Sequence, residues 1–383
     1  MISFQNVRQT MNTPIFEERT ARLLQLLQAA TEIDCDAAWI IKPANRRYLS
    51  GFTAEDTQLT ESSGSLLISD ENRWLVTDSR YTLTAENEAP SFSVYTVKKN
   101  FVEDIPEFTR HISFSRLGFE EDYLTWDLHQ KTGEKLAELS PPITLTPLKG
   151  MVDHMREIKE DWEVMALEKS ADMISKILDE VIGDLKPGVT EKEVAWRIEC
   201  LARENGAEGL SFPSIVASGP NSALPHAVPS NRKIQHREPI ILDVGVRLNG
   251  YCSDITRTVF LGEPDDTFKN IYRTVLHAQR SALGQISPSV QSTQVDAVAR
   301  NIIADAGFGA YFGHGLGHGV GLATHEGPRL GPREGTLLQT GNVFTVEPGI
   351  YLPGKGGVRL EEMVVLETAG PRILTNNGHF YDF

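Results

Sequence analysis

Residues 239–260 read PIILDVGVRLNGYCSDITRTVF, with Asn249-Gly250 near the centre. Asn-Gly is the dipeptide that two-residue β-hairpin turns favour, and the runs on either side are rich in Ile, Val and Thr. The stretch therefore predicts two antiparallel strands joined by a tight turn, in which Leu248 pairs with Tyr251.

This register places two carboxylates side by side. Asp254 then faces Gly245, and Asp243 lies two residues further along the same face. Diagonal neighbours have Cβ atoms about 7 Å apart or somewhat less, so both carboxylates can reach one or two cations between them. Both acids sit in strongly apolar strands, where an unpaired charge is costly, so we expect a positive charge beside them.

A second pair of predicted strands repeats this acidic pattern near the end of the chain. The strands read NVFTVEPGIYLP and GGVRLEEMVVL, and they carry Glu347 and either Glu361 or Glu362. Side-chain alternation puts Arg359 and Glu361 on one face, which favours Glu361 as the partner of Arg359. A structural ion pair with such an arginine is the alternative to a metal site.

Between the two strand pairs, GHGLGHGVGLATHEGP (313–328) holds three of the chain's ten histidines, His314, His318 and His325. Its glycines permit close approach of backbone and substrate. Two Asp, two Glu and one His suit a pair of divalent metal ions, because carboxylates bridge and an imidazole supplies one nitrogen. Two-metal hydrolases hold such ions about 3.5–4 Å apart and activate the water between them. A mobile loop is the alternative interpretation of the histidines.

The composition is that of an ordinary globular protein with an acidic surface. The 383 residues are 40% hydrophobic and 23% charged, with a formal net charge of -15. Such a surface repels phosphate backbones, so nucleic acid is not expected as a partner. No apolar run approaches the roughly 18 residues of a membrane span, and we expect neither a secretory signal nor a membrane partner. The three cysteines form no CxxC pair, which suits a reducing cytoplasm.

Two domains are predicted, with a proline-rich boundary between them. In the first, residues 1–150, a helix over 17–31 precedes the strand-like runs AAWIIK, GSLLIS and RWLVTD, which predicts an α/β domain. The segment ELSPPITLTPLKG (138–150) contains three prolines and ends in glycine, and it predicts the boundary.

The second domain, residues 151–383, is predicted to repeat one plan twice. A long helix over 157–185 precedes a second helix, whose start is marked by the capping-box pair Thr190 and Glu193. The first hairpin follows. Two further helical patterns precede the second strand pair, over residues 265–287 and 293–306.

Five motifs of the second domain, in this order and spacing, resemble the pita-bread metallopeptidases: prolidase, aminopeptidase P and, more distantly, methionine aminopeptidase. They read IVASGPNSALPHAVPS, ILDVGVRLNGYCSDITRTV, GHGLGHGVGLATHEGPR, VFTVEPGIYLP and GGVRLEEMVVL. Looser matches in NRRYLSGF, LVTDSRY and LGFEEDYLT resemble the N-terminal domain of prolidases and creatinase. The resemblance implies an α/β N-terminal domain of the creatinase/prolidase type, followed by an α+β pita-bread catalytic domain with pseudo-two-fold halves.

The resemblance also implies a set of metal ligands. Asp243 would hold one metal ion through both oxygens, and Asp254 and Glu361 would bridge two ions. His314 and Glu347 would complete the second ion. All five positions hold the residue type that the family uses, which disfavours the relatives that lack metals.

Four residues would contact the substrate. His318 and His325 would contact its carboxylate end and the tetrahedral intermediate. His226, in the motif ALPHAVP, would hydrogen-bond the scissile amide from the far side of the cleft. Arg329, in EGPR, would lie near the substrate's C-terminal carboxylate.

The implied reaction is metal-dependent hydrolysis of the peptide bond before proline, by a hydroxide held between two divalent ions. Glu347 would carry a proton towards the leaving nitrogen. His226 and His325 would stabilise the oxyanion, and Arg359 would steady Glu361 and the intermediate.

Short proline-containing peptides are the implied substrates and a homodimer the implied assembly. Mn is the favoured metal, with Co, Zn or Fe as alternatives. Dipeptidase and aminopeptidase P activity both stay open. Two other interpretations remain: a hydrolase or lyase of the same fold that acts on a small amidine, cyclic amidine or sulfonium compound, and a binding protein that carries no metal.

Overall fold

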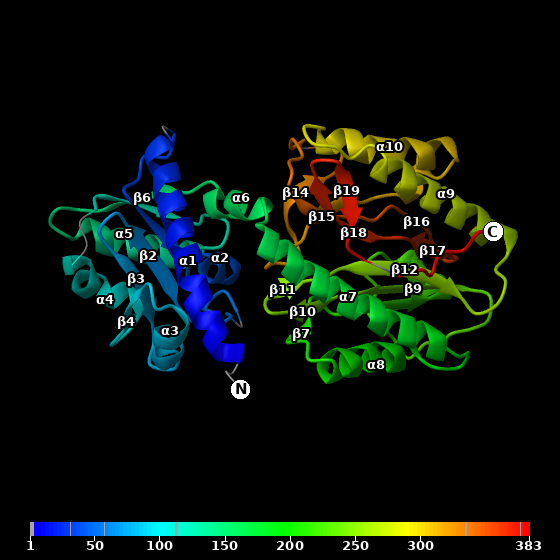
Figure 1. The fold of residues 1–383 in the computed structure, drawn as a ribbon, viewed down its shortest axis with the longest axis horizontal. Helices are drawn as coiled ribbons and strands as arrows, with labels where there is room; N and C mark the ends of the chain where they lie inside the picture. The colour runs from blue at the N-terminus through cyan, green and yellow to red at the C-terminus, as the bar shows by residue number, and fades with distance from the viewer. Residues whose placement is uncertain (1–3, 31, 57, 112–113, 334, 376) are drawn as a thin grey trace. The chain divides into compact units, whose positions relative to one another are not determined.

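The computed structural model describes residues 4–30, 32–56, 58–111, 114–333, 335–375 and 377–383. The chain forms two compact units, Met1–Met155 and Arg156–Phe383 (Figure 1). Within the described residues, no helix is long and apolar enough to cross a membrane.

A mixed six-stranded sheet forms the centre of the N-terminal unit, in the order β4-β3-β2-β1-β5-β6. Its strands are β1 (Ala37–Ile40), β2 (Ser65–Ser69), β3 (Arg73–Thr77), β4 (Ser93–Thr96), β5 (Arg116–Phe119) and β6 (Thr144–Pro147). The helices are α1 (Phe4–Ala29), α2 (Pro43–Ser50), α3 (Thr82–Glu88), α4 (Phe101–Phe108) and α5 (Trp126–Ala137). Apolar side chains of α4 and α5 pack against one face of this sheet. The predicted α/β character is confirmed, and the three strand-like runs form β1, β2 and β3.

The proline-rich segment 138–150, predicted as a domain boundary, contains a β-strand. Its middle forms β6, which pairs in parallel with β5 and completes the edge of the sheet. Proline is tolerated there because one side of an edge strand needs no ladder hydrogen bonds. The segment is therefore part of the N-terminal sheet and not a linker.

The long helix expected over 157–185 is confirmed as α7 (Asp161–Asp184), but it starts later than predicted. Helix α6 (Met151–Glu157) ends where that prediction begins, and α7 starts after a break. The break has a local cause, because Glu160 and Glu163 form a capping box that begins α7. The capping box of Thr190 and Glu193 begins α8 (Glu191–Glu204), as predicted.

The C-terminal unit consists of two halves, each with two helices and a set of strands. The first half contains α7, α8, β7 (Gly209–Leu210), β8 (Ile215–Ser218), β9 (Pro239–Val244), β10 (Val246–Leu248), β11 (Tyr251–Cys252) and β12 (Ile255–Phe260). The second contains α9 (Asp266–Leu283), α10 (Ser292–Asp305), β13 (Gly317–Gly319), β14 (Glu326–Leu330), β15 (Val343–Val346), β16 (Gly349–Leu352), β17 (Gly356–Arg359), β18 (Glu362–Glu367) and β19 (Gly370–Ile373). Figure 1 shows α9 and α10 on one side of the strands and α7 and α8 on the other. Each helix pair packs its apolar face into a core with its own strands.

The two hairpins share one construction. Leu248 pairs with Tyr251 as predicted, and the same register continues through β9 and β12, where Val244 pairs with Ile255. In the second hairpin, β15 pairs with β18 and β16 pairs with β17. Both ladders are interrupted halfway and then resume in register. Three of the predicted acidic residues lie at these two interruptions: Asp254, Glu347 and Glu361.

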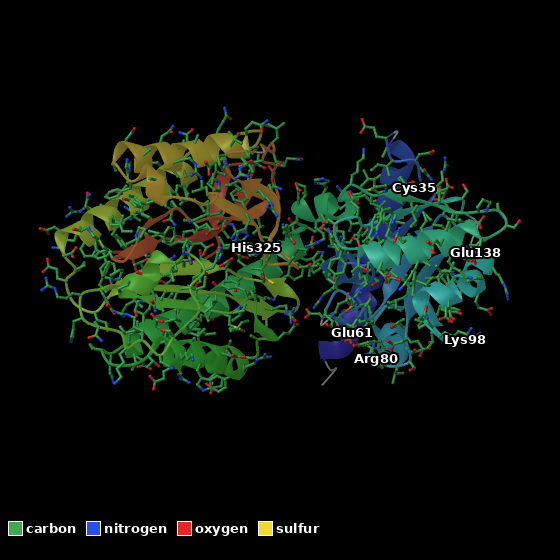
Figure 2. The ribbon with its side chains drawn as sticks, turned by 180° about the vertical axis from the view of Figure 1, so that it is seen from behind. Cys35, Glu61, Arg80, Lys98, Glu138 and His325 are labelled. Atoms are coloured by element: carbon green, nitrogen blue, oxygen red, sulfur yellow. The ribbon has the colours of Figure 1, made fainter. Side chains whose placement is uncertain are left out.

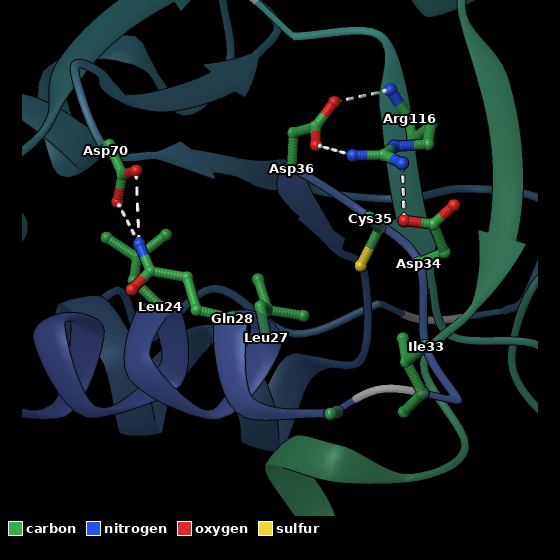
Figure 3. A pocket seen from close by; sticks show the side chains of 10 residues that line it. Leu24, Leu27, Gln28, Ile33, Asp34, Cys35, Asp36, Asp70 and Arg116 are labelled. Carbon is green, nitrogen blue, oxygen red and sulfur yellow. Dashed lines mark hydrogen bonds and ion pairs between the residues drawn. The ribbon is translucent and has the colours of Figure 1, made fainter.

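A cavity of about 340 Å³ lies in the N-terminal unit, beside α1 and the start of β5. Figure 3 shows Asp34 and Asp36 bound to Arg116 from two sides, and Gln28 of α1 reaching Asp70. Arg116 thus pairs with two of the acids that line the cavity, and the histidines and carboxylates predicted to be functional lie elsewhere, in the C-terminal unit.

Candidate active site

The interruptions of the two hairpins position three carboxylates. Asp254 lies in the gap between β11 and β12, where a Cβ on the facing Gly245 would lie 2.0 Å from the Ser253 carbonyl oxygen. In the second hairpin, Val346 pairs with Glu362 and Gly349 pairs with Arg359, so Glu347 and Glu361 lie opposite each other in the gap. The residues at the gaps leave the ladder, and their side chains are free to converge.

The carboxylates converge with one histidine of the glycine-rich stretch. Asp254, His318 and Glu361 each offer a ligand atom, and these atoms lie within 4.8 Å of one another. His318 Nε2 is 3.7 Å from Asp254 Oδ2 and 3.5 Å from Glu347 Oε1. Asp254, Glu347 and Glu361 thus lie near the imidazole of His318, which is not the histidine that the sequence analysis expected as the nitrogen ligand.

Close packing of the backbone brings His318 to this position. His318 lies in β13, between Gly317 and Gly319. A Cβ on Gly317 would lie 2.0 Å from the Thr345 carbonyl oxygen, so only glycine permits this approach of β13 to β15. The sequence analysis expected the glycines to permit close approach of the backbone, and Gly317 does so.

Asp243 joins the cluster through an arginine. Arg359, whose side chain is buried, makes an ion pair with Asp243 Oδ2. The predicted direct pairing of Arg359 with Glu361 is wrong. Arg359 Nε instead donates to Thr256 Oγ1 at 3.2 Å, and that hydroxyl donates to Glu361 Oε2 at 2.7 Å. The reason is that Thr256 pairs with Asp243 in the first hairpin and lies between the arginine and the glutamate.

Burial and mutual repulsion disfavour the charged forms of these acids. Burial, together with the charges of the other carboxylates, raises the pKa of Asp254 and of Glu361 well above their usual range. Burial raises the pKa of Glu347 to about 8; the charge of Arg359 partly offsets this rise, and Asp243 adds a smaller increase. Four carboxylates therefore share one buried arginine, and the site lacks positive charge.

The donor set fits divalent metal ions. Within the part of the chain that the structure describes, Asp243 Oδ1 is buried and has no hydrogen-bond partner. An unpaired carboxylate oxygen beside three further carboxylates and neutral imidazole is what hard and borderline divalent cations bind. The predicted ligands Asp243, Asp254, Glu347 and Glu361 thus lie together around a position that would accept a cation.

His314, the predicted nitrogen ligand, points to a different neighbour. Its Nε2 shares a 3.0 Å hydrogen bond with the Tyr351 hydroxyl, and its Nδ1 lies 2.7 Å from the Gly315 carbonyl oxygen. Burial and nearby positive charge lower the pKa of His314 to about 4, so its imidazole is neutral and can bind a metal. The structure places His318 nearer to the carboxylates, and the choice of His314 as the ligand stays a prediction.

The remaining predicted residues lie on the open side of this cluster. The rings of His318 and His325 meet at a centroid distance of 4.3 Å. His325 lies where the two halves of the C-terminal unit meet (Figure 2). Its side chain is exposed, as are those of His226 and Arg329. Burial lowers the pKa of His325, and His226 and Arg329 contribute to that shift. His318 and His325 are thus in ring contact, and His226 and Arg329 lie near enough to His325 to affect its charge.

Two residues of the site were not anticipated. Tyr351 is buried; its hydroxyl accepts a 2.8 Å hydrogen bond from Arg359 Nη1 and donates the 3.0 Å bond to His314 Nε2. Thr256 connects Arg359 with Glu361, as described above. Side-chain alternation offers a signal for both, since Thr256 is two residues from Asp254 and Tyr351 is four from Glu347. Neither hydroxyl can be assigned a partner without the fold.

Comparison with known proteins agrees with this geometry. Residues 165–368 match the family described as metallopeptidase family M24, and residues 19–158 match the creatinase/prolidase N-terminal domain. YqhT of Bacillus subtilis, described as an uncharacterized peptidase, is 35% identical over 356 residues, which cover 93% of this chain and 98% of that protein.

Solved structures are similar over both units. A Xaa-Pro dipeptidase from Bacillus anthracis has a TM-score of 0.87 and 35% identity, and the match covers 95% of this chain and 98% of that one. An X-Pro aminopeptidase from Thermotoga maritima has a TM-score of 0.82 and 36% identity, covering 94% and 98%. The fold is thus the predicted creatinase-type N-terminal domain followed by a pita-bread catalytic domain. The chain belongs to metallopeptidase family M24.

Proposed function

We propose that this metallopeptidase hydrolyses the peptide bond before proline in short peptides. The observation that carries the proposal is the cluster of four carboxylates, Asp243, Asp254, Glu347 and Glu361, which is buried or nearly so and shares one arginine. The choice of substrate is supported by the similar structures, which are Xaa-Pro peptidases by their descriptions. Cleavage of dipeptides and cleavage of longer peptides both remain compatible with this site.

Two divalent ions would be held by five side chains. Asp243, Asp254, Glu361 and Glu347 would supply oxygens, and His314 would supply the nitrogen. When bound, such ions lower the pKa of coordinated water and polarise a carbonyl oxygen. We favour Mn, with Co, Zn or Fe as alternatives, because mixed carboxylate and imidazole ligands suit all four.

Glu347 would hold and move the proton of the reaction. Among the four carboxylates of the cluster it is the most exposed, with 17% of its side chain accessible against 12% for Asp243. It also lies 3.5 Å from His318 at the open side. A carboxylate in this position can accept a proton and pass it on during the reaction. The leaving group is the ring nitrogen of proline, which must be protonated as it departs.

The exposed donors would bind and orient the substrate. His226 and His325 would donate hydrogen bonds to the oxygen that becomes negative. His318 and Arg329 would face the C-terminal carboxylate of the substrate. Arg359 would stabilise Asp243 directly and Glu361 through Thr256. Because the amide before proline has no N–H, recognition at that bond relies on shape and on carbonyl contacts.

A homodimer and a cytoplasmic location belong to this proposal as well. Both follow from the resemblance to prolidases and, for the location, from three free cysteines. Sedimentation of the purified protein tests the first, and fractionation of the source cells tests the second.

Proline release from defined peptides tests the proposal. The metal-stripped protein is reloaded with Mn or Co and assayed on Ala-Pro, Met-Pro, Ala-Pro-Ala and Ala-Ala. We expect metal-dependent cleavage of the proline peptides and none of Ala-Ala. Glu347→Gln should abolish it, while Glu367→Gln, a change at an exposed position of β18, should not.

The pattern of cleavage also separates the alternatives. Cleavage of the dipeptides alone indicates a dipeptidase, and cleavage of Ala-Pro-Ala indicates an aminopeptidase P. A metal-loaded protein that cleaves none of the peptides contradicts the proposal and favours a small amidine or sulfonium substrate. A protein that binds no metal contradicts it in favour of a binding function.

A further inference from the structure

The loop that carries His226 is held at its two ends by one buried residue. This loop runs from Ser218, at the end of β8, to Ser230, and its first residues form a short 3-10 helix. His226 is exposed near its tip, between Leu224 and Val228, which are 58% and 83% exposed. Ala227, next to His226, is buried in a small cluster with Ile215 and Ala217, so the backbone at the loop's ends sets where His226 lies.

Glu191 provides the anchor. It is the first residue of α8 and is fully buried. Its Oε1 accepts hydrogen bonds from Ser218 N at 2.7 Å and from Ser218 Oγ at 2.8 Å. Its Oε2 accepts from Ser230 N at 3.0 Å and from Ser230 Oγ at 2.7 Å. Asn221 Nδ2, inside the loop, donates to both oxygens at 3.1 and 3.0 Å.

The helix itself does not need this carboxylate. Thr190 caps α8, and the capping box is completed by Glu193. Glu191 is thus free to serve the loop although it begins the same helix. Burial alone would raise the pKa of Glu191, but hydrogen bonds from Ser230 and Ser218 outweigh it and lower that pKa, so the carboxylate is charged at neutral pH.

The anchored loop contacts the active site directly. The Pro225 carbonyl oxygen, next to His226, accepts a 3.2 Å hydrogen bond from Arg359 Nη1. Ser222 Oγ accepts a 2.8 Å bond from Gly357 N, at the start of β17. One side of the loop is therefore tied to the strand that carries Arg359, and its two ends are tied to Glu191.

We propose that Glu191 is a positioning residue that fixes the loop 218–230 and thereby presents His226 to the substrate. The inference rests on the proposed function, because it assumes that His226 contacts the scissile amide. Misplacement of a contacting group by about 1 Å can reduce a rate by about 10²-fold. Loss of the charge at Glu191 should therefore reduce kcat without releasing metal.

The test combines Glu191→Gln with His226→Ala in the metal-loaded protein. We expect Glu191→Gln to lower kcat for Ala-Pro by about 10- to 100-fold, with KM changed less and the metal content unchanged. In the His226→Ala background, Glu191→Gln should have no further effect, because there is no histidine left to position. Glu193→Gln, on the same helix, should retain wild-type activity. Hydrogen exchange of residues 219–229 should be faster in Glu191→Gln.

Several results would overturn this inference. If the effects of Glu191→Gln and His226→Ala multiply, Glu191 acts independently of the histidine. Equal losses in Glu191→Gln and Glu193→Gln would show a general effect on α8. If Glu191→Gln does not fold, Ser230→Ala removes a single hydroxyl donor from the anchor, and its smaller loss of kcat must also vanish in His226→Ala. A wild-type protein that cleaves no proline peptide contradicts the proposed function instead, whereas the exchange measurement still reports on the anchor.

Discussion

Two groups of buried acids in the C-terminal unit behave in opposite ways. Glu191 is fully buried, yet its pKa is lowered, because serine and asparagine donors and two backbone N–H groups surround it. Asp254 and Glu361 are also buried, but their pKa values are raised, because their neighbours include other carboxylates. Both groups are buried, so the opposite directions of their pKa shifts come from the number of hydrogen-bond donors that surround each carboxylate.

Another buried acid, Glu326, shows a further way to compensate a buried charge. Glu326 is paired with Arg156 and with Lys159, and all three side chains are almost inaccessible. The chain thus supplies donors to Glu191 and cations to Glu326, while the cluster at the hairpins receives one arginine for four carboxylates. A buried acid indicates a metal site only when the chain leaves it uncompensated.

The largest effects are expected when two adjacent glutamates, Glu361 and Glu362, are each replaced by glutamine in separate variants. Glu361→Gln removes a proposed metal ligand, so we expect a loss of bound metal and a fall in kcat/KM of about a thousandfold, or about 4 kcal/mol. Glu362→Gln leaves Arg257 without its buried partner, so it should lower the free energy of unfolding by about 3 kcal/mol while metal content is retained. Metal analysis and thermal unfolding measure both. The reverse pattern would mean that the wrong glutamate has been assigned to the site.

The nitrogen ligand is tested by a second pair of variants. If His314 binds metal, His314→Ala should reduce the metal content from two ions to one. His318→Ala should then keep both ions and mainly raise KM. If His318 binds the metal instead, as its proximity to Asp254 and Glu361 suggests, His318→Ala should lose one ion and His314→Ala should keep both. Metal content after dialysis at a fixed concentration of free Mn decides between them.

The smallest expected effect is a dependence of stability on pH. Glu347 has a folded pKa of about 8, above its ordinary value of 4.5, so the folded metal-free protein binds more protons than the unfolded chain between these values. The stability of the metal-free protein should therefore fall as the pH rises from about 5 to 8. Mn should stabilise the protein more at pH 8 than at pH 6, because metal binding displaces these protons.

Unfolding temperatures of metal-free and Mn-loaded protein at both pH values measure this effect. Glu347→Gln provides the control, since it removes one of the groups and should flatten the dependence for the metal-free protein. A metal-free protein that gains stability from pH 6 to pH 8 would show that the cluster is ionised without metal, as Glu191 is.

Local patterns in the sequence predicted much of this molecule. Asn249-Gly250 set the register of the first hairpin, and that register carries Asp243 and Asp254 to the same face. The capping box at Thr190 marked the start of α8. Such features depend on turn chemistry and on side-chain period, which act between residues that are near in the chain.

Other features depend on contacts between distant segments, and the sequence could not supply them. The pairing of Arg359 with Asp243 instead of Glu361 follows from the placement of Thr256 between the two hairpins. The short break before α7 and the edge strand β6 were also missed. A glutamate at the N-cap looks like a residue within a helix, and a proline-rich strand looks like a linker, when only the neighbouring sequence is considered.

The sequence by itself determined the family, the two acid-bearing hairpins and the residue types of the site, because these follow from short motifs and their spacing. Only the tertiary structure decided which acids the chain leaves uncompensated and which it surrounds with donors. Glu191 and Glu361 are the same residue type, and the sequence alone does not separate their roles. They differ because five donors reach Glu191 from a loop that begins 27 residues away, whereas Glu361 meets the other carboxylates across two hairpins.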